Sequence, residues 1–223
     1  MTDTNRPAPF FIADHVALDI LNSIACPNDT EFEWLGNGHD LINWLEHARL
    51  VTKKELKHLR SADQRATCDE IATEICALRE WFREFVSVHA GQPLDTSTLK
   101  KLSPLNKILA AGNNYKQIEL RESEQTTAGD NNLNLKWQRY RHRLNPSDLL
   151  PLIAEIMGDL ICQTDFSLVK NCEGPTCTLW FYDISKNHSR RWCTMSICGN
   201  RVKAALHRAK KKASKNKSAS RLN

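Results

Sequence analysis

The chain has 223 residues with 31 basic and 26 acidic side chains, a net charge of +5, and its length suits one ordinary domain with a small module beside it. The charge is unevenly divided, because residues 184–223 hold 12 of the basic side chains and none of the acidic ones. No apolar run approaches the ~20 residues of a membrane span and the N-terminus has no signal-peptide pattern, so we expect a cytoplasmic protein with no membrane partner.

Three helices are expected in the first sixty residues. Apolar residues recur at helical spacing over 10–26. Asp40 is the expected N-cap of a second helix over 41–50. Thr52 and Glu55 have the spacing of a capping box, which predicts a short third helix directly afterwards.

The clearest helix signal runs over 63–90. Its apolar residues fall on one face, and Gly91 followed by Pro93 provides the stop signal. Further helices are expected over 97–110 and 148–162, each with apolar residues at helical spacing.

Between these last two helices the apolar period changes to two residues. Ile118 and Leu120 alternate with polar residues, and so do Leu135 and Trp137, with a polar stretch between the two runs. This pattern predicts an antiparallel hairpin with a long loop. We therefore expect residues 10–165 to form a mainly α domain with a small β-hairpin.

Two cysteine pairs follow, each with four residues between its members: Cys172 with Cys177, and Cys193 with Cys198. This spacing suits a tetrahedral zinc site, because each pair can place two sulfurs on one ion. Four thiolates leave no open coordination position, so the zinc is expected to be structural rather than catalytic. A module this small also needs a bound metal ion to stabilise its fold, since it cannot bury a sufficient core alone.

The rest of the module predicts a treble-clef-like zinc finger. Residues 179–182 are apolar and suit a strand, residues 183–187 are turn-like, and a helix is expected from Cys193 onward. We expect the finger with its basic helix to span 168–210, and residues 211–223 to form a flexible basic tail.

The segment without acidic residues is expected to bind an anionic partner. Coupled to a zinc module, it favours nucleic acid, with DNA first. The alternative is a zinc-dependent adaptor that binds an acidic protein or RNA. Binding to anionic lipid is less favoured, because the apolar side of the basic helix is mostly alanine.

The C-terminal motifs resemble the CGNR zinc-finger family. They are Cys172-x4-Cys177, Phe181-x-Asp183-x-Ser185 and Arg190-Arg191-Trp192-Cys193-x-Met195-x2-Cys198-Gly199-Asn200-Arg201-x-Lys203. The stretch around Leu18-Asp19 and the segment 40–45 are similar to the ABATE domain that usually precedes this finger. The resemblance implies a bacterial, stress-linked transcriptional regulator with the four cysteines as zinc ligands. It also implies that Gly199 and Asn200 let the helix start approach the metal closely.

Candidate contacts to DNA lie in and beside the last part of the finger. The resemblance places three arginines beside the metal site, and helical spacing places Asn200, Lys203 and His207 where they could reach base edges. The other basic residues would meet phosphates. The full candidate set is Arg190, Arg191, Asn200, Arg201, Lys203, His207, Arg208, Lys210, Lys211 and Lys212.

The N-terminal domain offers one candidate ligand pocket. His15 and Asp19 are four residues apart on the expected first helix, with Asn22 on the same side, so they could line a pocket for a small-molecule effector. This domain is also the candidate for homodimerisation, since one finger has a small footprint on DNA. No nucleophile–histidine–acid spacing and no phosphate-binding glycine loop occurs, so we expect no enzymatic activity.

Overall fold

The computed structural model describes residues 6–26, 30–112, 115–120, 135–140, 144–205, 207–208 and 211, with the backbone alone for 115–120 and 135–140. Within these residues the protein is mainly α-helical, with short antiparallel strand pairs and a four-cysteine cluster near the C-terminus. The predicted fold class is therefore confirmed. None of the helices in this part of the chain has the length and apolar character needed to cross a membrane.

The N-terminal segment contains a helix much shorter than the one predicted over 10–26. Helix α1 comprises only Val16–Leu21. Strand β1, Ile24–Ala25, then pairs with strand β2, Phe32–Glu33, so the end of the predicted helix is a strand instead. Residues 6–14 are not helical and are called the strap below.

Backbone contacts explain why α1 begins late. Asp14 has a positive φ of 59°, which a right-handed helix cannot contain. His15 then caps α1, with Nδ1 accepting a hydrogen bond from the backbone N–H of Ala17. Before this turn, the N–H groups of Ile12 and Ala13 donate to the Asp19 carboxylate at 3.0 and 3.1 Å. The apolar spacing at the start of the chain therefore reflects the packing of a non-helical strap.

Helix α2, Gly38–His47, begins three residues before its predicted start. The N-cap is Asn37 rather than Asp40, and the Asn37 side chain accepts from the backbone N–H of Asp40 at 2.9 Å. Glycine suits this first turn, since a Cβ on Gly38 would lie 2.6 Å from the Cβ of Cys68. The close packing of α2 on the later helix thus fixes where α2 starts.

Helices α3 and α4 confirm the predicted signals. Helix α3, Lys53–Leu59, begins with the capping box of Thr52 and Glu55. After the 3-10 turn η2, Ala62–Gln64, helix α4 spans Arg65–His89 and is followed by Gly91 with a φ of 80°. The long apolar face and the stop signal were therefore reliable guides.

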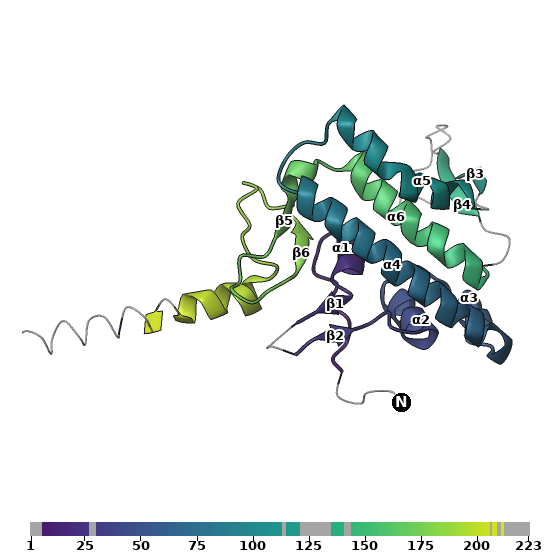
Figure 1. Ribbon diagram of the computed structural model, residues 1–223, viewed down its shortest axis with the longest axis horizontal. Coiled ribbons are helices and arrows are strands. Elements are labelled where there is room, and N and C mark those ends of the chain that lie inside the picture. Colours follow the sequence, from purple (N-terminus) through teal and green to yellow (C-terminus); the bar gives the residue numbers. More distant parts are fainter. Residues whose placement is uncertain are drawn as a thin grey trace, which may run out of the picture.

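Helices α5 and α6 pack beside α4. The 3-10 helix η3, Thr96–Leu102, leads into α5, Ser103–Ala110. The turn η4, Pro146–Asp148, leads into α6, Leu149–Gln163. Figure 1 shows α6 running alongside α4, with α5 on its other side. These helices form the body of the molecule.

The predicted hairpin is present as strands β3, Tyr115–Leu120, and β4, Leu135–Tyr140. The two strands are antiparallel, and Ile118 lies opposite Trp137 in the register. The loop predicted between them lies outside the described residues.

The finger begins with turn η5, Phe166–Leu168, and strand β5, Val169–Asn171, which pairs with β6, Trp180–Tyr182. Turn η6, Met195–Gly199, starts a helix that continues through 205. One hydrophobic cluster includes residues of α1, α4 and α6 together with residues of the finger. The finger and the helical body thus share a continuous core, and Figure 1 shows the finger at one end of that body. Its members from the finger are Phe166, Val169, Cys172, Leu179, Phe181, Cys193 and Cys198.

Candidate metal centre and nucleic-acid surface

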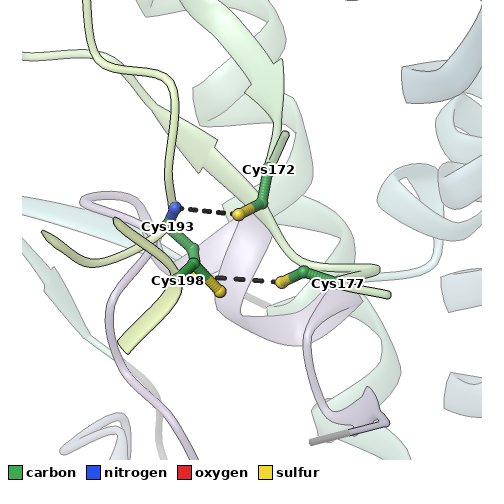
Figure 2. Close-up of side chains that lie close together, drawn as sticks. All are labelled: Cys172, Cys177, Cys193 and Cys198. Atoms are coloured by element: carbon green, nitrogen blue, oxygen red, sulfur yellow. Dashed lines mark hydrogen bonds between the residues drawn. The ribbon is translucent and has the colours of Figure 1, made fainter. Parts of the chain in front are cut away.

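The four cysteine sulfurs converge within the finger. Cys172 directly follows β5, Cys177 precedes β6, and Cys193 and Cys198 come from the segment that starts the C-terminal helix. Figure 2 shows the four side chains together, and their sulfurs all lie within 4.8 Å of one another. The Cys193 sulfur is 3.8 Å from that of Cys177 and 3.6 Å from that of Cys198. A tetrahedral zinc ion with sulfurs at about 2.3 Å requires separations of about 3.8 Å, so the donor set fits zinc.

Two backbone features bring these sulfurs together. The N–H of Cys177 donates to the C=O of Gly174 at 3.0 Å, which closes a tight turn within the first pair. A Cβ on Gly174 would lie 3.3 Å from the sulfur of Cys198, so glycine leaves the room that the cluster needs. The N–H of Cys193 donates to the sulfur of Cys172 at 3.2 Å (Figure 2). Such outer hydrogen bonds orient metal ligands and stabilise their charged form.

Gly199 makes a close contact different from the predicted one. A Cβ at Gly199 would lie 2.3 Å from the sulfur of Met195 and 3.5 Å from the ring of Trp192. Glycine at this position therefore leaves room for these two side chains, and the closer approach of the helix start to the metal stays a prediction. The Asn200 side chain donates to the C=O of Ser196 at 3.1 Å, so it too stabilises the helical turn.

The charge state of the cluster also suits a bound cation. Hydrogen bonding from Cys193 lowers the pKa of Cys177 to about 5 against the opposing effect of burial. Hydrogen bonding to Cys177 in turn raises the pKa of Cys193, because that thiol is the donor. Cys172, Cys193 and Cys198 are buried. Burial raises the pKa of Cys198 to about 12, so these buried thiols would lose their protons only beside a positive partner such as a metal ion. A dication held by all four sulfurs would have no open position, which is typical of a structural site.

Asp183 organises the loop that follows β6. Its buried carboxylate accepts from the Nζ of Lys170 at 2.6 Å and from the backbone N–H of Arg190 at 2.9 Å. The backbone N–H and the hydroxyl of Ser185 donate to it as well. Burial alone would raise the pKa of Asp183, but these donors outweigh burial and lower the pKa to about 2. The Asp183-x-Ser185 pattern therefore fixes the loop that leads to Cys193.

A two-way hydrogen bond joins the finger to the N-terminal segment. The Asn22 side chain donates to the C=O of Trp180 and accepts from its N–H, both at 2.9 Å. The N–H of Tyr182 donates to the C=O of Ala13 in the strap at 2.8 Å. Strand β6 thus bonds β5 along one edge and the N-terminal segment along the other.

Arg190 takes part in the same contact between the finger and the N-terminal segment, which is called the joint below. Its guanidinium forms an ion pair with Asp14 and lies 4.3 Å from the ring centroid of Phe181. It also donates to three backbone carbonyls from the strap and the finger. These contacts give Arg190 a role in holding the finger against the strap. The carbonyl groups are those of Ile12, Trp192 and Cys193.

The other basic candidates lie on an exposed surface. Residues 200–205 form a helix that projects from the finger in Figure 1. Arg191 pairs with the exposed Glu173 and lies 5.2 Å from the ring of Trp192. No acidic residue follows Asp183 in the chain, so the segment itself contributes only positive charge to this surface. Asn200, Arg201, Lys203, His207, Arg208 and Lys211 are exposed, whereas Lys210 and Lys212 lie outside the described residues.

The three candidate pocket residues make internal hydrogen bonds. His15 caps α1, Asp19 holds the strap, and Asn22 holds β6. Burial raises the pKa of Asp19 to about 6, although the N–H groups of Ala13 and Ile12 oppose this shift. Burial also lowers the pKa of His15. These contacts account for the polar side chains without a ligand.

Sequence reasoning missed two residues that shape the site. Gly174 had a readable signal, since a glycine between two closely spaced cysteines favours a tight turn. Asp14 had none, because its partner Arg190 is 176 residues away in the chain. Contacts at such separation arise only from the tertiary packing.

Comparisons with known protein families match two parts of the chain. A family model described as "Putative stress-induced transcription regulator", named ABATE, matches residues 14–164. A second model, "CGNR zinc finger", matches residues 169–211 and so contains all four cysteines. A search of curated proteins finds no match.

Proposed function

Because the chain belongs to the ABATE family and carries a CGNR zinc finger, we propose that it is a transcription regulator that binds DNA through the finger. Zinc would be held by Cys172, Cys177, Cys193 and Cys198 and would supply structural stability rather than catalysis. The N-terminal domain would sense an effector or form a dimer. The protein would act in the cytoplasm, where thiols remain reduced and available to a metal.

One observation supports DNA as the partner above the others. The metal cluster sits at the base of an exposed helix, within a segment that contains no acidic residue after Asp183. A rigid base fixes the direction of the helix, and a cationic helix suits the negative charge density of a duplex. The helix diameter also suits the major groove.

The exposed residues divide into two proposed roles. Basic side chains would contact phosphates and set the affinity. Asn200 and His207 would face base edges, which is where sequence is read. Arg190 is left out of this set, because its donors already serve the joint with the strap. The proposed phosphate contacts are Arg191, Arg201, Lys203, Arg208 and Lys211.

A dimer would extend the small footprint of one finger. A single module of this size buries little surface on DNA, and regulators with one reading helix per chain commonly bind two half-sites. We therefore propose that two copies bind together.

An acidic protein partner is the second candidate, and one observation favours it. Ile184, Met195 and Ile197 are more than half exposed on the finger, and apolar side chains beside positive charge suit a protein surface. RNA is less favoured, because the finger aromatics do not form an exposed stacking platform. Phe181 is fully buried, and Trp180 is only partly exposed.

Hydroxyl-radical footprinting at low salt would test the proposal. The zinc-loaded protein is expected to protect a short stretch of backbone on a duplex, repeated at about one helical turn if two copies bind. Identical cleavage with and without protein would contradict DNA binding and move the acidic-protein partner to first place.

A further inference from the structure

A cavity of about 820 Å³ lies between the start of α2 and the connection from α3 to α4. This volume is within the range of small-molecule sites, about 300–1,000 Å³. Ile42, Leu59 and Cys68 line the cavity, and each is buried, so part of its wall is apolar. The lining also contains arginine, histidine and aspartate side chains. The cavity therefore offers an apolar surface and charged groups together.

The acidic groups of the lining already have partners. Both carboxylate oxygens of Asp40 accept from Arg6, at 2.5 and 2.9 Å. Asp69 accepts from the N–H of Gly38 at 2.7 Å, at the positive end of α2. The ion pair with Arg6 offsets the charge of Asp40, and the N-terminus of α2 partly offsets that of Asp69.

Two arginines of the lining have weaker side-chain contacts with the rest of the protein. Arg60 pairs with Glu46 at 2.6 Å, but both side chains are about half exposed, and such pairs contribute little. The Arg65 side chain makes no ion pair or hydrogen bond with another residue that the structure describes. Arg65 is also the first residue of α4, where the helix dipole disfavours a positive charge. Arg65 is exposed, so its guanidinium is available to an anionic ligand.

We propose that this cavity binds an organic anion. The apolar body would lie against Ile42, Leu59 and Cys68, and a carboxylate or phosphate group would pair with Arg65 and Arg60. Guanidinium groups suit this task because their planar N–H donors match both kinds of anion.

The strap connects the cavity with the finger. Arg6 lines the cavity at one end of the strap, where it also donates to the C=O of Glu33. At the other end, Ala13 and Asp14 contact Tyr182 and Arg190 of the finger. A ligand that changes the pairing of Arg6 would therefore act on a segment that holds the finger. As an effector site this cavity rests on the proposed function, whereas as a binding site it does not.

Isothermal titration calorimetry of the full-length, zinc-loaded protein with 1-naphthoate would test the binding site. The neutral analogue 1-naphthamide has nearly the same shape and no charge. We expect naphthoate to bind at least tenfold more tightly than naphthamide, and Arg65→Ala to remove that difference. Lys57→Ala, an exposed cation of α3 outside the cavity, should change nothing. Equal binding of naphthoate by the wild type and Arg65→Ala would overturn the proposal.

The rate of zinc release to a chromogenic chelator would test the connection through the strap. Saturating naphthoate should change this rate at least twofold in the wild type and leave it unchanged in Arg65→Ala. Binding without any change in the release rate would remove the strap as the link. Neither result depends on DNA, so failure here is distinct from failure of the proposed function.

Discussion

Asp19 is the buried carboxylate that holds the strap, and its pKa of about 6 makes stability depend on pH. The pKa is raised above the unfolded value of about 3.9, so the stabilisation is complete below about pH 4 and is lost as pH rises through 6. Asp19→Asn keeps an oxygen acceptor for the two N–H donors and removes the titration. We expect the free energy of unfolding of the variant, relative to that of the wild type, to rise by on the order of 2 to 3 kcal/mol between pH 4 and 7. Urea unfolding across this range measures it, and parallel curves would contradict the assignment.

Asn22 satisfies both backbone groups of Trp180, and its loss would leave them without that partner. We expect Asn22→Ala to lower the free energy of unfolding by about 2 to 4 kcal/mol, because each unpaired buried group costs about 1 to 2 kcal/mol. Asn43→Ala, which removes hydrogen bonds on the exposed face of α2, should cost less than about 0.5 kcal/mol. Similar losses in the two variants would show that the joint is not a special point of stability.

At the scale of elements, sequence patterns predicted those helices and strands whose formation depends on neighbouring residues. The apolar face of α4, the capping box of α3 and the alternation in β3 and β4 are each set by neighbouring residues. The length of helix α1 was overestimated, because the positive φ of Asp14 interrupts a helical backbone and Asp19 binds the non-helical strap. Strands β1 and β2 have two residues each, which is too short for any alternation to be read.

Two arginine substitutions can distinguish the role of the joint from the role of the exposed basic helix. We expect Arg190→Ala to speed zinc release and lower the melting temperature while leaving the salt dependence of DNA binding unchanged, because this side chain holds the joint. Arg208→Ala on the exposed helix should do the reverse, reducing the salt slope by about 0.9 for one phosphate contact. Chelator kinetics and binding titrations on both variants check this. A reduced salt slope in Arg190→Ala would return Arg190 to the DNA-contacting set.

At the scale of the whole molecule, the cysteine spacing located the metal cluster but did not reveal the shared core. The cluster depends on spacing within 27 residues of sequence, whereas the joint unites Asn22 with Trp180 and Asp14 with Arg190 across most of the chain. Of the three residues predicted to line a pocket, Asn22 has its partner Trp180 at the far end of the sequence, whereas His15 and Asp19 bind backbone groups within seven residues of themselves.

Metal removal should therefore affect more than the finger. After chelation, or in Cys198→Ser, we expect amide hydrogen exchange to lose protection in 166–205 and also in the strap, because β6 and Arg190 hold the strap in place. Helices α4 and α6 should stay protected, since they pack on each other independently of the metal. Loss of protection throughout the chain would mean that the metal holds the whole fold. An unchanged strap would mean that the joint is weak.

The central claim is that the zinc-organised helix is the DNA-binding element. The most direct test is fluorescence anisotropy on a random duplex, titrated with salt, for a wild type compared with two double variants. Lys203→Glu with Arg208→Glu changes the exposed basic helix, and Lys53→Glu with Lys57→Glu makes the same charge change on α3. With five phosphate contacts at about 0.9 each, the log–log salt slope should be near −4.5 for the wild type and the α3 variant. The helix variant should bind much more weakly with a slope nearer −2.7. Equal binding by both double variants would contradict the claim.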